Sequence, residues 1–90
     1  MDKRLYVIKY SDPGVDEPTY ALYDQRGNSR VHFTSAETIH HFFNQGQLHH
    51  GMVHNARTPR RLVEQVAESF PGTPKIRFSE ASLDEVMERT

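Results

Sequence analysis

Three short apolar runs separated by two turn-forming segments fill the first 34 residues of the chain. Leu5–Tyr10, Thr19–Asp24 and Arg30–Thr34 are rich in aromatic and β-branched residues, and their apolar and polar positions alternate, which predicts three strands. The connecting segments, Ser11–Pro18 and Gln25–Asn28, carry the proline, glycine, asparagine and aspartate residues that are typical of turns. Such short connections join neighbouring antiparallel strands, so the sequence predicts a three-stranded meander.

Two helices are predicted after the meander. The first covers residues 34–45: it opens with the capping box Thr34-Ser35-Ala36-Glu37 and ends before Gly46, where a left-handed conformation is needed. The second covers residues 59–70, and Thr58-Pro59 indicates an N-cap followed by proline at the first helical position. Both segments are apolar along one side only, as is typical of helices that pack on a sheet.

The last part of the chain predicts a short strand at 75–78 and an acidic helix opened by a capping box at 82–85. The element order β-β-β-α-α-β-α predicts an α+β fold. We expect one small domain, residues 1–90, in which the helices pack on one face of an antiparallel sheet. Residues 47–57 show no clear pattern, and the position of the fourth strand in the sheet is left open.

The composition narrows the class of protein. The 90 residues include no cysteine, which excludes disulfides and thiolate metal sites. Small secreted domains usually need such cross-links, so we expect a cytoplasmic protein. No apolar run approaches the roughly 20 residues of a membrane span, and no signal peptide is visible. We therefore expect no membrane partner.

The net charge of −1 conceals an uneven distribution. Residues 38–63 contain three arginines, five of the six histidines and no acid, whereas the segments before and after are acidic overall. This separation predicts an oriented contact with a charged partner, and the positive charge grows as the pH falls toward 6. The alternative is that a short chain clusters its charges by chance.

Three arginines surround the predicted start of the second helix, where free backbone amides favour anions. The alternative is a solvated helix face on which Arg60 pairs with Glu64, and Arg61 with Gln65. Arginine is mildly unfavourable in a first helical turn, which tilts the interpretation toward binding. The predicted partner-binding residues are Arg57, Arg60, Arg61, His49, His50, His54 and Thr58.

The sequence gives less support to metal binding, catalysis or base stacking. His50 and His54 have a spacing found in metal sites, but neither cysteine nor an H-E-x-x-H motif accompanies them. No nucleophile elbow, P-loop or dinucleotide motif is present, so we predict no enzymatic activity, metal or cofactor. The four tyrosines of the first two strands could stack bases, but we expect at least half of them in the core.

In size, lack of cysteine and lack of a catalytic signature, the chain is similar to small accessory proteins of phages and mobile elements, including anti-CRISPR inhibitors. We expect a non-enzymatic protein-binding module, an inhibitor or adaptor, that docks on a larger protein or nucleoprotein through residues 38–63. One alternative is a nucleic-acid-binding regulatory protein that uses the three arginines. Another is a histidine-based metal or pH sensor. A free sheet edge would also permit a homodimer.

Overall fold

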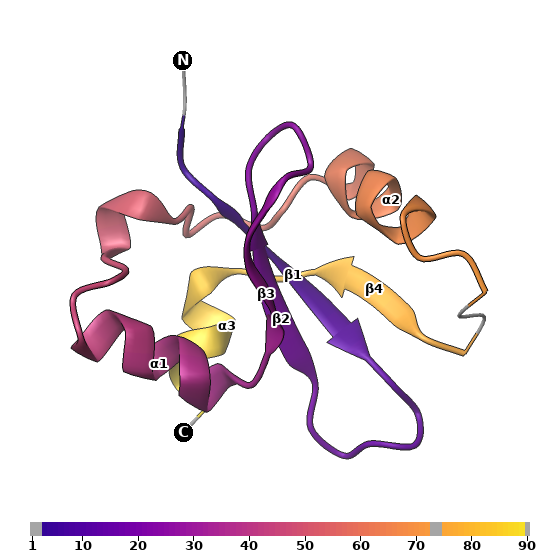
Figure 1. The fold of residues 1–90 in the computed structure, drawn as a ribbon, viewed down its shortest axis with the longest axis horizontal. Helices are drawn as coiled ribbons and strands as arrows, with labels where there is room; N and C mark the ends of the chain where they lie inside the picture. Colours follow the sequence, from indigo (N-terminus) through magenta and orange to yellow (C-terminus); the bar gives the residue numbers. More distant parts are fainter. Residues whose placement is uncertain (1–2, 73–74, 90) are drawn as a thin grey trace.

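The computed structural model describes residues 3–72 and 75–89, which form one four-stranded sheet and three α-helices. The strands are antiparallel and lie in the order β3-β2-β1-β4. The predicted α+β class and meander are confirmed, and β4 pairs with β1 at the sheet edge. The elements are β1 (Tyr6–Ser11), β2 (Thr19–Tyr23), β3 (Ser29–Thr34), α1 (Ala36–Asn44), the 3-10 helix η1 (His50–Met52), α2 (Arg60–Glu68), β4 (Arg77–Glu80) and α3 (Leu83–Glu88) (Figure 1).

The helices occupy both faces of the sheet, which corrects the expectation that they share one face. Val7 and Leu22 point into a core with α1 and α3, whereas their neighbours Ile8 and Ala21 point into a core with α2. Figure 1 shows α1 and α3 on one side of the strands and α2 on the other. Strands that are apolar at consecutive positions can be covered on both faces, so the helical stripes alone could not assign the faces.

Each face therefore has its own buried core, and the two cores share the sheet. On the α1/α3 face the buried residues are Leu5, Val7, Tyr20, Leu22, Ala36, Ile39, Leu48, Val53, Ala81, Leu83 and Val86. On the α2 face they are Ile8, Ala21, Tyr23, Leu62, Val63 and Val66.

A β-bulge in β3 changes which face of the sheet its apolar side chains point to. Tyr20 pairs with Thr34 and Leu22 pairs with Val31, so three residue steps on β3 oppose two on β2. The extra residue reverses the alternation of side chains. As a result, Val31 packs on the α1/α3 core and Phe33 packs on the α2 core.

Helix caps agree with the predictions in part. Ser82 caps α3, because its hydroxyl accepts the Glu85 amide at 3.4 Å. Gly46 has the positive φ, 78°, that was expected after α1. However, the cap of α1 is Ser35 and not Thr34: the Ser35 hydroxyl accepts the Thr38 amide at 3.1 Å, so the helix begins one residue later.

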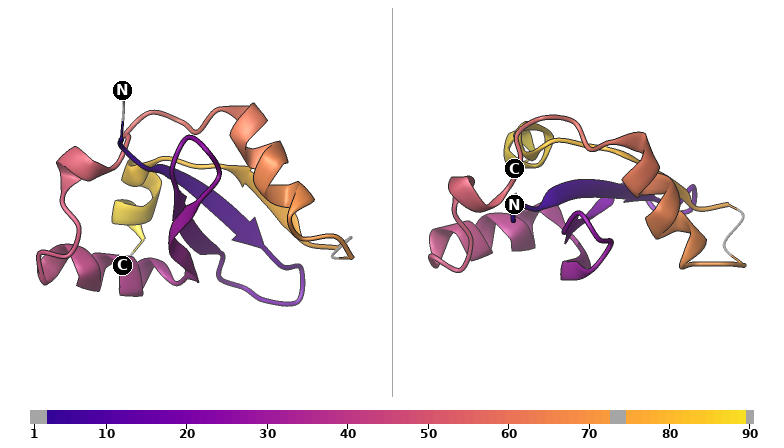
Figure 2. Two further views of the ribbon diagram at one scale, coloured as in Figure 1. Left: turned by 45° about the horizontal axis from the view of Figure 1, so that its top comes forward. Right: turned by 90° about the horizontal axis from the view of Figure 1, so that it is seen from above.

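Residues 45–59 form a strap that leads from α1, across the end of the sheet, to α2 (Figure 2). The Leu5 amide donates to the Met52 carbonyl and the His54 amide donates to the Leu5 carbonyl, both at 2.8 Å. These bonds make a parallel bridge between Leu5 and Val53. Because β4 reaches only as far as Ile8 along β1, the strap covers the part of the β1 edge that β4 leaves open.

Candidate interaction surface

The acid-free segment 38–63 does not form one continuous surface. Its first part belongs to α1, on one face of the sheet, and its last part belongs to α2, on the opposite face. Only the strap joins the two parts, and Val53 and Leu48 are buried in the α1/α3 core. A contact surface must therefore be assembled from part of the segment together with neighbouring elements.

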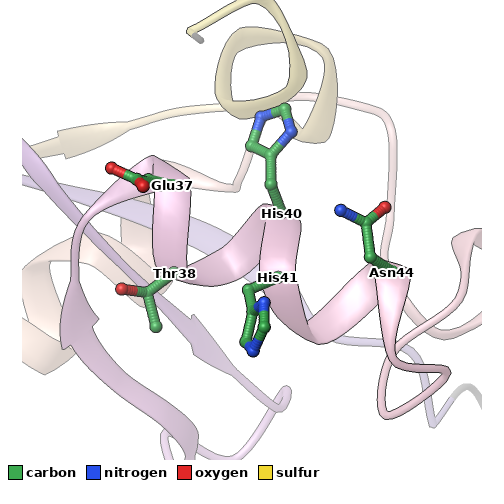
Figure 3. A pocket seen from close by; sticks show the side chains of 5 residues that line it. All are labelled: Glu37, Thr38, His40, His41 and Asn44. Carbon is green, nitrogen blue, oxygen red and sulfur yellow. The ribbon is translucent and has the colours of Figure 1, made fainter.

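The histidines are dispersed along this path. His40 and His41 lie on α1, where Figure 3 shows His40 pointing toward α3 and His41 pointing away from it. The His40 Nε2 atom lies 2.9 Å from the Val86 carbonyl, so this imidazole links α1 to α3. Within residues 3–72 and 75–89, no three histidine or acidic side chains gather in a way that could hold a metal ion.

The three histidines of the predicted surface have different environments. His49 and His50 are exposed around η1, and the His50 ring lies 5.1 Å from the ring of Phe43. His54 is partly buried and stacks on Tyr6, with ring centroids 4.2 Å apart and planes inclined by only 14°. His49 and His50 are therefore accessible to a partner, whereas His54 is partly covered by the fold.

Thr58 lies inside the protein, and this removes it from the predicted contact surface. Its side chain is only 2% exposed. Its hydroxyl donates toward the carbonyls of Val7 and Ala81, and its backbone amide donates to the Ala81 carbonyl at 3.2 Å. Since the hydroxyl is used here, it does not cap α2; the cap position is Pro59, which has no side-chain hydrogen bond.

The three arginines differ in their partners. Arg60 lies 3.8 Å from Glu64 and 3.6 Å from Glu80, so the predicted i, i+4 pair is confirmed. Arg57 and Arg61 are exposed and form no ion pair with any described residue. The predicted partner of Arg61, Gln65, instead donates its side-chain amide to the Arg26 carbonyl at 2.9 Å.

The Gln65 bond brings cations from the first third of the chain to α2. Arg26 lies in the β2–β3 turn, and Arg30 follows it near the start of β3. Lys3 precedes β1, which begins at the same end of the sheet because Tyr6 pairs with Tyr23. We call five of the exposed cations at this end the basic end: Lys3, Arg26, Arg30, Arg57 and Arg61.

Three members of the basic end were absent from the sequence prediction, which considered only segment 38–63. Lys3, Arg26 and Arg30 line one hollow of about 340 Å³, together with the polar side chains of Gln25 and Asn28. Antiparallel pairing of consecutive strands was the signal that could have located them, because it brings the start of β1 and the β2–β3 turn to the same end of the sheet.

Asp24 also lines this hollow, but its carboxylate is already bonded within the turn. Its Oδ1 atom accepts the backbone amides of Asn28 and Arg26, each at 2.9 Å. The Asn28 amide contributes most to holding the pKa of Asp24 below its usual value. The carboxylate therefore stays charged and shapes the turn, while the three cations around it outnumber it.

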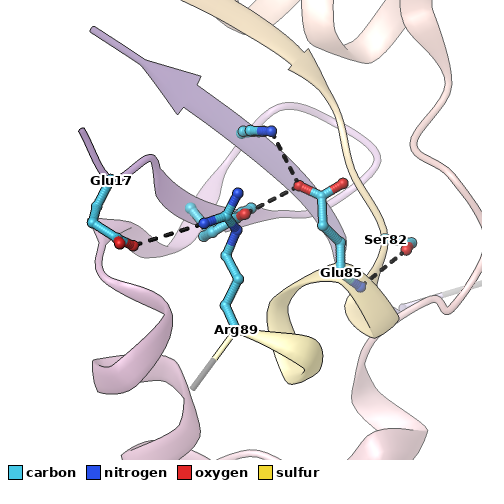
Figure 4. Close-up of polar contacts among 6 residues, drawn as sticks. Glu17, Ser82, Glu85 and Arg89 are labelled. Atoms are coloured by element: carbon cyan, nitrogen blue, oxygen red, sulfur yellow. Dashed lines mark hydrogen bonds and ion pairs between the residues drawn. The ribbon is translucent and has the colours of Figure 1, made fainter. Parts of the chain in front are cut away.

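Acidic residues gather at the opposite end of the sheet. Glu17, Glu37 and Glu88 come from the β1–β2 loop, α1 and α3, and they line one hollow with Arg89. Arg89 lies 3.7 Å from Glu17 (Figure 4). We call Asp12, Asp16, Glu17, Glu37 and Glu88 the acidic end.

Beside the acidic end, Glu85 of α3 connects the helix to the sheet. It accepts a hydrogen bond from the Tyr20 hydroxyl at 3.0 Å and lies 3.4 Å from the Lys9 ammonium (Figure 4). Burial, followed by the bond to Glu85, raises the pKa of Tyr20 to about 12. Glu85 is therefore engaged within the fold.

The aromatic residues of the sheet mostly pack within the protein. Tyr20 and Tyr23 are buried, in line with the expectation that at least half of the tyrosines belong to the core. Tyr10 joins an aromatic cluster that packs against the α2 core, with ring centroids 4.9–6.0 Å apart. The other rings of this cluster are Phe33, Phe70 and Phe78.

Comparisons with protein families, with curated proteins and with solved structures find no match to this chain. Among the described residues, no helix has both the length and the apolar character needed to cross a membrane. The distribution of exposed charge is therefore the feature of the molecule that bears on its function.

Proposed function

We propose that this protein is a non-enzymatic binding module, an inhibitor or adaptor, that docks on a larger protein partner through its basic end. The observation that carries the proposal is the exposure of Arg57 and Arg61 without ion pairs to any described residue. On a solvated helix face an arginine can pair with an acid one turn away, as Arg60 does with Glu64, and Arg60 also lies near Glu80. Cations left without such neighbours support a contact with an external anion.

The acidic end on the opposite side supports the same proposal. A molecule with opposite charges at its two ends is oriented by the field of a charged partner before contact. Such steering raises the association rate and selects one docking orientation. The exposed His49 and His50 extend the proposed surface along the strap.

The first test is capture of partners from a lysate of the source cells on the immobilised protein, with and without nuclease. The proposal requires a stoichiometric protein partner that remains after nuclease treatment. Binding of that partner should weaken at least about tenfold in the Arg57→Glu/Arg61→Glu variant, mainly through a slower association rate. The matched control is Lys75→Glu/Arg77→Glu, which changes the charge equally at two exposed cations beside or within β4.

Recovery of nucleic acid alone, or loss of all partners with nuclease, would replace this proposal with the nucleic-acid alternative. The same exposed arginines favour that alternative, because arginine and lysine bind the phosphates of a nucleic acid whatever its nucleotide sequence. A binding constant that falls steeply with salt for duplex DNA would support it. Equal weakening by the control variant would mean that net charge, and not the basic end, determines binding.

A further inference from the structure

We infer that the hollow beside the β2–β3 turn is an anion-binding subsite that receives carboxylates from a compact acidic patch on the protein partner. The inference rests on the proposed function and extends the contact from Arg57 and Arg61 to Lys3, Arg26 and Arg30. These three cations line a hollow of about 340 Å³ and come from two separate segments of the chain. The sequence segment that first indicated binding contains none of them.

The donors around the hollow suit a carboxylate. The arginine guanidinium is planar and presents paired N–H groups that match the two oxygens of a carboxylate. Arg26 and Arg30 supply two such groups, and Lys3 adds a compact positive charge. The side-chain amide of Gln25 can donate a further hydrogen bond from the same wall, whereas that of Asn28 already donates to the Asp24 Oδ2 atom at 3.3 Å.

The turn that carries these donors is held in place. Asp24 accepts amides from Arg26 and Asn28, so the carboxylate within the hollow is bonded to its own turn. Gln65 then fixes the turn to α2 through its bond to the Arg26 carbonyl. Arg61 lies one helical turn before Gln65, which places it on the side of α2 that contacts this turn.

A protein patch fits this surface better than a nucleic acid does. Proteins that bind single strands place aromatic rings beside their cations so that bases can stack. Here the most exposed phenylalanine, Phe70, belongs to the cluster with Phe33 and Phe78, whereas Tyr6 at the basic end is already stacked on His54. Domains that bind nucleic acid are also usually basic overall, and this chain has a net charge of −1.

The test is an NMR titration of the full ¹⁵N-labelled chain with an oligoglutamate peptide and, separately, with duplex DNA of equal charge at the same salt. The peptide should shift the backbone amides of residues 24–30 and 57–61. It should bind at least about tenfold more weakly to the Arg26→Glu/Arg30→Glu variant, and nearly normally to Lys75→Glu/Arg77→Glu. The unliganded spectra of both variants show whether each remains folded.

Several results would overturn the inference. These are shifts confined to other residues, equal weakening in the two variants, or tighter binding of the DNA than of the peptide. The lysate partner separates this failure from failure of the proposed function. If Arg57→Glu/Arg61→Glu abolishes capture while Arg26→Glu/Arg30→Glu leaves it unchanged, the docking surface stands and the subsite is wrong. If no protein partner is captured, the proposed function fails, and the carboxylate partner fails with it.

Discussion

At the scale of single residues, Thr58 connects three segments that are distant in sequence. Its hydroxyl donates toward the carbonyls of Val7 and Ala81, and Thr58 itself lies near the end of the strap. Thr58→Val keeps the shape of the side chain but removes the donor, so the buried carbonyls lose a partner. We expect a loss of about 1–3 kcal/mol in the free energy of unfolding, measured by urea denaturation.

Thr58→Ser is the matched control for this prediction. It keeps the hydroxyl and removes one buried methyl group, so we expect a smaller loss of about 1 kcal/mol. If the valine variant were as stable as the wild type, the hydroxyl would contribute nothing and the strap would be held by its backbone bonds alone.

Tyr20 makes the stability of the protein sensitive to high pH. Its folded-state pKa is about 12, whereas an unfolded tyrosine ionises near 10. The folded state therefore keeps the proton to a higher pH than the unfolded state does. The contribution of Tyr20 to the free energy of unfolding is complete below pH 10 and is lost as the pH rises toward 12. At about 1.4 kcal/mol for each pKa unit, the full loss is roughly 3 kcal/mol.

Tyr20→Phe should remove most of this dependence. At neutral pH the variant should lose about 1 kcal/mol, because the bond to Glu85 is gone. Above pH 10 its stability should fall less than that of the wild type; the residual slope comes from Tyr23, whose pKa is also raised by burial. In an ultraviolet titration of the folded variant, the tyrosine ionisation step at the highest pH should be absent. An unchanged titration curve would contradict the assignment of that step to Tyr20.

At the scale of elements, the β2–β3 turn depends on Gly27 for two reasons. Its φ is +88°, and a Cβ atom there would meet the Gln65 Nε2 atom at 2.6 Å. Gly27→Ala should cost about 1–2 kcal/mol for the backbone alone. The clash adds to this cost by displacing Gln65 from the Arg26 carbonyl, and thermal denaturation should show both effects.

Two further variants separate the backbone cost from the clash. In a Gln65→Ala background, Gly27→Ala should retain only the backbone cost. Gly51→Ala should change stability by less than about 0.5 kcal/mol, because Gly51 lacks a positive φ and its nearest atom, His49 Nδ1, is 3.7 Å away. Equal costs at Gly27 in the two backgrounds would show that the Gln65 contact is not rigid.

The identity of the elements could be predicted from sequence, because alternation and apolar stripes are local properties. Their arrangement could not. Residues 47–57 gave no pattern, because the strap is defined by pairing with Leu5, a residue distant in the chain. The bulge that turns Val31 and Phe33 to opposite faces likewise depends on the register with β2.

For the candidate surface, too, contacts within one helix could be predicted from sequence, and contacts between distant segments could not. The pair Arg60–Glu64 follows from helical spacing, and the structure contains it. Thr58 was misplaced because a threonine before proline looks the same in sequence whether it caps a helix or bonds to a strand. Arg26 and Arg30 could be added only once the pairing of strands and the Gln65 contact were known.

At the scale of the whole molecule, one sheet separates two cores, and neither core has strands of its own. Ile39 belongs to the α1/α3 core and Val66 to the α2 core. Because β1 and β2 contribute to both, we expect the cores to unfold together. Ile39→Val should cost about 1 kcal/mol and Val66→Ala about 2 kcal/mol, and each should shift one common calorimetric transition.

The size of the expected shift in Tm follows from the length of the chain. A domain of 60–100 residues loses about 4–8 °C in Tm for each kcal/mol. A second transition in either variant, or a calorimetric enthalpy unequal to the van't Hoff enthalpy, would mean that one core can melt without the other.

The separation of the basic end from the acidic end also affects how copies of this protein behave together. The unlike ends of neighbouring molecules attract, and a net charge of −1 with a pI near 6.6 supplies almost no general repulsion. Such head-to-tail contacts continue from copy to copy unless the rotation between copies closes them into a ring. The protein should therefore be least soluble near neutral pH in dilute buffer, and moderate salt should dissolve it.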